Sequence, residues 1–252
     1  MTRDFTLSKY EALCKALISS GNRSITVQDY IQGQAVEPFV ILRHDVDRRP
    51  EMALEMAGME KDMGIRATYY FRMVPGVFEP GIIKMIRDMG HEIGYHYEVL
   101  DKVKGDKENA IVLFEKELKM FREVADVKTA CMHGNPIASW SNRDMWQEYD
   151  FKDFDIIGEP YLSIDYKTVL YLTDTGRNWE NKFSVKDIVT DNIKERIKST
   201  DDIIKLIKSR KYQQMCILAH PNRWTDNAVL WTIELFWQNI KNIGKAIIKA
   251  TS

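Results

Sequence analysis

The chain has 252 residues, of which 44% are hydrophobic and 29% charged, and its formal net charge is −1 at pH 7. This length suits one large α/β domain with a substantial core. The near-neutral charge excludes a global attraction to nucleic acid or to an anionic membrane. No run reaches the roughly 20 apolar residues of a membrane span, and the N-terminus lacks the apolar stretch of a signal peptide. We therefore expect a cytoplasmic protein.

The first half of the chain predicts alternating helices and strands. A capping box, Ser8-Lys9-Tyr10-Glu11, introduces a helix that runs to about Ser20. Short apolar or aromatic runs predict strands over 39–42, 67–71 and 92–94. Helices are predicted between and after them, over 50–64 with Pro50 in the first turn, over 82–89 with a stop at Gly90, and over 107–124.

The second half continues this alternation with one irregular stretch. A strand precedes His133, and a helix that starts at Ser141 covers 145–149. Residues 155–190 are mostly loop-like, with strand candidates at 155–157 and 168–172 and a turn at 174–177. A helix over 201–209, a strand over 215–219 and a C-terminal helix over 228–249 follow. That last helix has its apolar residues on or near one stripe, namely Leu230, Ile233, Leu235, Trp237, Ile240 and Ile243.

Repeated strand–helix units favour a parallel sheet, either open or closed into a barrel. Because no internal repeat or linker interrupts the chain, we expect a single domain. It comprises an N-terminal helix and lead-in (1–37), a core (38–224) and a C-terminal helix (225–252). The three widely spaced cysteines, Cys14, Cys131 and Cys216, predict reduced and mostly buried thiols.

All five histidines lie in short polar clusters, and four of these clusters follow a strand-like run. The carboxyl ends of parallel strands share one edge of the sheet, where α/β proteins build their sites. Imidazoles together with carboxylates at this edge indicate a divalent metal or acid–base chemistry. The histidines are His44 in the first cluster, His91 and His96 in the second, His133 in the third and His220 in the fourth.

Two carboxylates end the first strong strand. If the chain is still extended there, Asp45 and Asp47 project from one side and His44 from the other. The pair could bind a cation, or one carboxylate could bind a metal while the other accepts a proton. Alternatively, one of these aspartates could have a purely structural role, as the cap of the following helix and as the partner of Arg48 or Arg49 in a salt bridge.

The remaining clusters supply imidazoles of different kinds. His91 follows a predicted helix end, where it would cap the helix dipole rather than catalyse. His96 lies just beyond a short strand, as a ligand should, and Glu98 either supports it or faces solvent. His133 lies in a turn in which Gly134 allows a close backbone approach. His220 follows a strand that Pro221 terminates.

Candidate substrate-binding residues flank these clusters. Asn135 offers both a donor and an acceptor, and flat aromatic rings can cover the apolar faces of a sugar. Each aromatic residue is equally compatible with ordinary packing. The set is Asn135, Arg177, Trp179 and Trp224.

Across about residues 38–224, these clusters in this order resemble the polysaccharide deacetylase (NodB-homology) family. The most specific part is Gly90-His91-Glu92-Ile93-Gly94-x-His96, which precedes the first metal-binding histidine of that family. The carboxylates of the first strand, the proline-bearing third loop and the Leu218-x-His220 strand end fall in the expected order. The resemblance implies a distorted (β/α) barrel and a metal-dependent enzyme that removes N- or O-acetyl groups from sugars.

The resemblance also implies residue roles. Asp45 matches the catalytic base of the family, and Val46 falls on its metal-binding aspartate, a role that Asp47 can take if the loop is shifted by one residue. Leu100 stands at the position of the second metal-binding histidine, and leucine cannot coordinate. His133 is the expected replacement, with His44 and Glu98 as other possibilities.

The first functional hypothesis is thus a metal-dependent hydrolase of an acylated carbohydrate. Asp47, His96 and His133 would bind the metal, Asp45 would be the base, and His220 the acid. Zinc suits a mixed site with histidines, and manganese, nickel or iron are alternatives. The other hypotheses are a catalytically silent sugar-binding barrel, which Leu100 favours, and a hydrolase of a small non-sugar amide.

Overall fold

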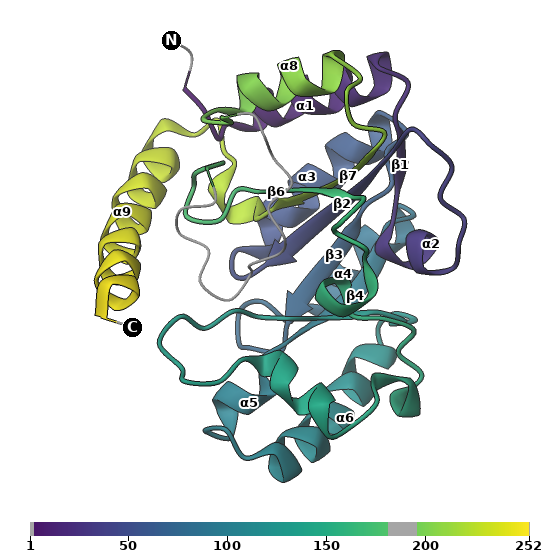
Figure 1. Ribbon diagram of the computed structural model, residues 1–252, viewed down its shortest axis with the longest axis vertical. Helices are drawn as coiled ribbons and strands as arrows, with labels where there is room; N and C mark the ends of the chain where they lie inside the picture. Colours follow the sequence, from purple (N-terminus) through teal and green to yellow (C-terminus); the bar gives the residue numbers. More distant parts are fainter. Residues whose placement is uncertain (1–2, 181–195, 252) are drawn as a thin grey trace.

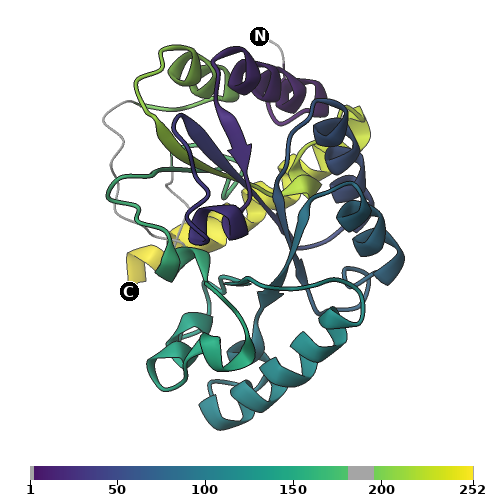
Figure 2. The same cartoon turned by 90° about the vertical axis from the view of Figure 1, so that its right-hand side faces the viewer.

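A computed structural model describes residues 3–180 and 196–251 and builds them around a parallel sheet that curls into a half-barrel (Figure 1, Figure 2). Neighbouring strands follow the order β5-β4-β3-β2-β7-β6, and β1 pairs with the start of β2. The strands are β1 (Arg23–Ile25), β2 (Phe39–Val46), β3 (Thr68–Arg72), β4 (Glu92–Tyr97), β5 (Ala130–Met132), β6 (Leu170–Thr173) and β7 (Gln214–Ala219). This confirms the predicted α/β architecture with a barrel-like sheet.

Helices connect successive strands and cover the outside of the sheet. The α-helices are α1 (Leu7–Ser19), α2 (Val27–Ile31), α3 (Pro50–Asp62), α4 (Pro80–Asp88), α5 (Val99–Lys102), α6 (Lys107–Arg122), α7 (Pro160–Ser163), α8 (Thr200–Lys208) and α9 (Ala228–Thr251). Short 3₁₀ helices are η1 (Asn142–Gln147), η2 (Phe151–Phe154) and η3 (Pro221–Arg223). In Figure 1, α1 and α8 lie side by side above the sheet, while α9 lies at its edge.

The strand β2 lies at the centre of the sheet and is covered on both faces. All eight of its residues are buried, as expected for a parallel strand with both faces covered. It pairs with β3 on one side and β7 on the other. The carboxyl ends of β2, β4, β5 and β7 therefore lie along one edge, and the polar clusters follow them there.

Several local predictions were wrong. The N-cap of α1 is Thr6, whose hydroxyl accepts from the Lys9 amide, and Ser8 instead donates to Asp226. The segment 155–157 is not a strand, since only Gly158 bridges to Thr129. The predicted helix over 145–149 is the 3₁₀ helix η1. The strand β1 was missed because three residues carry too little periodicity to be recognised.

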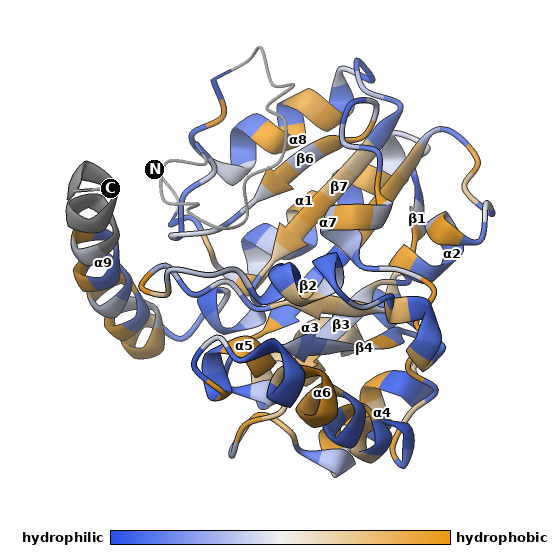
Figure 3. Cartoon of the chain, turned by 60° about the horizontal axis from the view of Figure 1, so that its bottom comes forward, coloured by the Kyte–Doolittle hydropathy of each residue, from blue (hydrophilic) through white to orange (hydrophobic). Residues whose placement is uncertain are grey.

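The hydrophobic core is continuous from α1 across the sheet to α6. Figure 3 shows mainly hydrophobic strands at the centre of the molecule, with α9 standing apart at its margin. Cys14, Cys131 and Cys216 are all buried, as predicted. Among the described residues, no helix combines the length and the apolar character needed to cross a membrane.

Candidate metal and acid–base site

A cavity of about 350 Å³ opens at the carboxyl edge of the sheet. Five side chains singled out in the sequence line it: Asp45, Asp47, His96, His133 and His220. The other lining residues are Gly134, Pro136, Ile137, Thr175, Arg223, Gln238, Lys241 and Gly244. Its volume lies within the range usual for small-molecule sites, about 300–1,000 Å³.

The alternation of β2 brings Asp45, and Asp47 just after the strand, into this cavity and sends His44 to the opposite face of the sheet. His44 is fully buried there, with its Nε2 2.7 Å from Glu60 Oε1 and 3.3 Å from the Tyr10 hydroxyl. The expectation that Asp45 and Asp47 share a side is confirmed. The suggestion that His44 supports the site is wrong, because successive residues of a strand point to opposite faces.

Asp47 lies at the centre of three imidazoles. Its Oδ1 is 3.6 Å from His96 Nε2 and 3.7 Å from His133 Nε2, and its Oδ2 is 3.9 Å from His220 Nε2. These distances exceed hydrogen-bond length, and the buried Oδ1 has no hydrogen-bond partner. Burial by itself would raise the pKa of Asp47, but the three histidines hold it well below its ordinary value.

Each of these imidazoles has an oxygen atom on the side away from Asp47. His96 Nδ1 lies 3.0 Å from the Cys131 carbonyl, and His220 Nδ1 lies 2.6 Å from Asp174 Oδ1. His133 Nδ1 faces Glu98 Oε2 at 3.4 Å. His133 Nδ1 makes no hydrogen bond within the described part of the chain, and His220 Nδ1 also lies 2.9 Å from Arg223 Nη1. The Nε2 atoms of all three imidazoles lie on the side of Asp47. Glu98 thus lies beside His133 rather than His96, and its carboxylate is held by Arg72, whose Nη2 donates to Oε2 at 2.5 Å.

A buried arginine holds Asp45. Arg43, two residues earlier on the same face of β2, donates from Nε and Nη2 to the two carboxylate oxygens at 2.9 and 2.7 Å. The guanidinium also stacks 4.6 Å from the Tyr161 ring. Burial would raise the pKa of Asp45, but Arg43 and His96 lower it below its ordinary range, so the carboxyl is ionised at neutral pH.

The protonation of the two ligand-like histidines differs. Burial lowers the pKa of His96, but Asp45 and Asp47 outweigh this effect and raise it. For His133, burial prevails over the attraction of Asp47, and its pKa lies below the ordinary value. A neutral imidazole is the form that binds a metal, so His133 is in the coordinating form near neutrality.

Asp174 is a site residue that the sequence analysis placed in a turn and otherwise missed. It follows β6, and its carboxylate contacts His220 Nδ1, Arg223 Nη1 at 2.6 Å and Trp224 Nε1 at 2.8 Å. Burial would raise the pKa of Asp174, whereas Arg223 and His220 lower it to about 2. The rule that identified the histidines, a polar residue just after a strand, would have found Asp174 too.

The predicted substrate-binding aromatics are core residues. Trp179 and Trp224 are 2% and 1% exposed, and neither lines the cavity. Trp179 Nε1 donates to Thr200, and its ring stacks on Phe5. The ring centroids of Trp179 and Trp224 lie 6.0 Å apart. Both indoles therefore contribute buried apolar area to the core and do not contact the cavity.

Two other predicted contacts also lie outside the cavity. Arg177 stacks 4.3 Å from the Trp231 ring and donates to the Trp231 carbonyl. Asn135 accepts from the Ile137 amide in its own loop, although its neighbours Gly134 and Pro136 line the cavity.

His91 and Leu100 have structural roles. His91 contacts the Ala67 amide and the Ala57 carbonyl of α3, at 3.2 and 3.0 Å, rather than the end of the preceding helix. Its lack of a catalytic position agrees with the sequence analysis, but the predicted contact was wrong. Leu100 is buried in α5.

A buried group that could hold a metal ion is also present. Asp45, His96 and Cys131 have ligand atoms that all lie within 4.8 Å of one another. His96 and Cys131 are register partners on β4 and β5, which places them at the same level of the sheet. His96 thus belongs both to this group and to the imidazoles around Asp47.

No protein-family model matches the sequence, and no curated protein matches it either.

Proposed function

We propose that this protein is a metal-dependent hydrolase that removes an acyl group from an N- or O-acylated sugar. The observation that carries the proposal is the arrangement around Asp47. Three imidazoles have Nε2 within 3.6–3.9 Å of the partly exposed Asp47 carboxylate, and each Nδ1 faces an oxygen atom. Oxygen partners of this kind orient histidines for metal binding and for proton transfer.

Each separation between Asp47 and a neighbouring imidazole suits a shared divalent cation. However, the ligand atoms of Asp47, His96 and His133 do not all lie within 4.8 Å of one another, so His96 and His133 would have to move closer together on binding. Two ligands that each lie about 2.1 Å from a tetrahedral ion are separated by roughly 3.4 Å. The Asp47 Oδ1 to imidazole Nε2 separations of 3.6 and 3.7 Å are close to this value. Asp47, His96 and His133 would hold the ion, with zinc best suited to such a set and manganese, nickel or iron as alternatives.

Asp45, His96 and Cys131 form the alternative ligand set. Both oxygens of Asp45 already accept hydrogen bonds from Arg43, so a metal would compete with a buried guanidinium. Asp47 Oδ1, in contrast, is buried without a partner. Because leaving a buried carboxylate oxygen unpaired is costly, Asp47 is the better candidate ligand.

Asp45 is the proposed general base of the site, and His220 is the proposed general acid. A divalent metal, when bound, polarises an acyl carbonyl and lowers the pKa of a water molecule. Asp45 is ionised and held in one orientation by Arg43, so it can accept the proton of that water. His220 has its Nε2 towards the cavity and Asp174 behind it, so it can donate a proton to the leaving amine or alkoxide.

Metal analysis of variants purified without chelator tests the ligand set. We expect the wild type to contain one divalent ion, and His96→Ala and His133→Ala each to lose more than about 100-fold in metal affinity, beyond the usual effect of an outer partner. Cys131→Ser should retain the ion. Loss of metal in Cys131→Ser with retention in His133→Ala would assign the ion to the alternative set.

A catalytically silent sugar-binding barrel is the second candidate, and Leu100 favours it. This residue, at the position where the resemblance calls for a ligand, is 1% exposed within the core. A wild type without metal and without turnover on a panel of acetylated sugars, but with measurable sugar binding, would establish this alternative. Turnover of small acylated amides only would indicate a non-sugar substrate.

A further inference from the structure

The helix α9 presents its apolar face to solvent and its polar face to the protein. On the inner side, Glu234, Gln238 and Asn242 are only 1%, 3% and 8% exposed. The outward side chains are 39–67% exposed; they are Val229, Ile233, Phe236, Trp237, Ile240 and Ile243, here called the α9 stripe. A surface helix normally shows the opposite arrangement.

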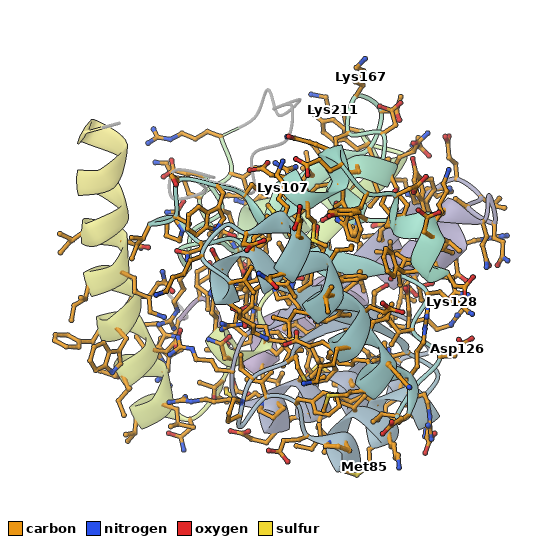
Figure 4. All side chains as sticks on the ribbon, turned by 90° about the horizontal axis from the view of Figure 1, so that it is seen from below. Met85, Lys107, Asp126, Lys128, Lys167 and Lys211 are labelled. Carbon is orange, nitrogen blue, oxygen red and sulfur yellow. The ribbon has the colours of Figure 1, made fainter. Side chains whose placement is uncertain are left out.

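Specific contacts fix this orientation. Glu234 forms an ion pair with Arg48 at 2.6 Å, and Asn242 donates to the Gly176 carbonyl at 2.9 Å. Gln238 donates to Asn242 at 2.8 Å, which links the polar residues along the inner side. Turning the apolar face inwards would break these contacts, so the α9 stripe remains exposed in a single copy of the chain. Figure 4 shows α9 at the margin of the molecule, with side chains that project away from its body.

The spacing of the α9 stripe indicates a helical partner. Residues 229, 233, 236, 240 and 243 follow one another at intervals of four, three, four and three. This is the heptad pattern with which two helices pack along a seam. Phe236 and Trp237, whose ring centroids lie 6.3 Å apart, provide the large aromatic anchors that dominate binding at interfaces.

We propose that the α9 stripe pairs with the same stripe of a second copy of this chain. The stripe carries no charged residue, so a two-fold contact brings apolar side chains together without like-charge repulsion. Its six side chains expose on the order of 600 Å², close to the roughly 800 Å² per partner of a standard interface. Single exposed residues need no explanation, but a continuous patch of this size does.

A membrane surface fits α9 less well than a second copy. Helices that lie on anionic membranes are rich in lysine and arginine on their polar side. The 24 residues of α9 include three lysines, Lys241, Lys245 and Lys249, and no arginine, and Lys241 lines the cavity. The inner side of α9 thus forms part of the cavity wall, through Gln238, Lys241 and Gly244, and pairing would brace that wall.

Sedimentation equilibrium of the full chain tests the pairing, which requires no metal. We expect the wild type to have the mass of two copies and Ile240→Glu that of one copy. Met85→Glu on α4 is the matched control, because Met85 and Ile240 are both 46% exposed, and it should keep the dimer. Thermal melts followed by circular dichroism should show that both variants fold. A wild type that stays monomeric at high concentration, or an Ile240→Glu protein of unchanged mass, would overturn the proposal.

Cross-linking supplies a second readout. Residue 236 is in the middle of the α9 stripe, so it meets its own copy whether the two helices run parallel or antiparallel. Phe236→Cys should form a disulfide-linked dimer under mild oxidation, whereas Met85→Cys should not. The native cysteines are buried and do not interfere. Absence of the cross-link, or binding of a monomer to anionic lipid vesicles, would count against a second copy as the partner.

Discussion

At the scale of residues, three carboxylates of the site are distinguished by their neighbours. Asp45 is paired with Arg43 and Asp174 with Arg223, whereas Asp47 has imidazoles around it. An arginine fixes the orientation of a carboxylate and neutralises it. Asp47 is therefore the carboxylate that is best placed for a cation, and the other two suit positioning and proton transfer.

The ion pairs of Asp174 predict a pH dependence of stability. Its pKa falls from an ordinary 3.8 to about 2, because Arg223 and His220 outweigh the opposing effect of burial. A depressed pKa stabilises the fold fully above the unfolded value, and this contribution is lost as the pH falls from about 4 through about 2. The shift corresponds to about 2 kcal/mol.

Urea unfolding at a series of pH values checks this prediction. The difference in the free energy of unfolding between wild type and Asp174→Asn should shrink by about 2 kcal/mol from pH 4 to pH 2. Asp126→Asn is the control, because the side chain of Asp126 is 77% exposed. Parallel pH profiles of the wild type and Asp174→Asn would show that Asp174 does not carry this dependence.

At the scale of elements, the packing of β3 against β4 explains one glycine of the second cluster. Tyr70 and Gly94 are register partners, and a Cβ on residue 94 would lie 2.2 Å from the Tyr70 ring. The Tyr70 hydroxyl is held 2.9 Å from Thr129 Oγ1, so the ring cannot readily move away. Gly94 therefore allows β4 to approach β3 closely, and His96 follows two residues later on the same strand.

Gly94→Ala should lower the free energy of unfolding by about 1–3 kcal/mol, the usual cost of overfilling a packed interior. Gly58→Ala in α3 is the matched control, since no atom lies within 4 Å of the added Cβ. Alanine is better than glycine within a helix by roughly 0.5–1 kcal/mol, so this control should be more stable than the wild type. Equal stabilities of the two variants in urea would contradict the packing argument.

At the scale of the whole molecule, the two faces of the sheet carry different groups of polar residues. The inner side carries the cavity, while the outer side holds a buried polar cluster around Glu60. Its carboxylate accepts from the hydroxyls of Tyr10 and Tyr69 and lies 2.7 Å from His44. These residues belong to α1, β3 and β2, so Glu60 of α3 joins two helices to the central strands.

Loss of Glu60 should therefore destabilise the whole fold. Glu60→Ala leaves fully buried polar partners unpaired, and we expect a loss of about 3 kcal/mol or more in the free energy of unfolding. Glu55→Ala, an exposed change on the same helix, should have little effect. Thermal and urea unfolding of both variants measure the difference. If the two variants were equally stable, the cluster would not be the link between helices and sheet.

The sequence by itself determined most of the elements and the meeting of five site residues. Apolar periodicity and helix-capping patterns are local properties, so they predicted the longer helices and most strands to within a few residues. They missed β1 and the short helices α2, α5 and α7, and they wrongly gave a strand over 155–157 and an α-helix over 145–149. Polar residues after strands predicted that Asp45, Asp47, His96, His133 and His220 share one edge. This followed from a general property of parallel sheets, whose carboxyl ends lie together.

The tertiary structure alone decided which partner each group has. That Trp179 and Trp224 pack in the core, and that Asp174 stands behind His220, depends on residues distant in the sequence. The orientation of α9 is the clearest case, because the apolar stripe of a surface helix normally faces the core. Contacts of its polar side with Arg48 and Gly176 instead turn that stripe outwards, because satisfying buried polar groups outweighs covering the apolar side chains.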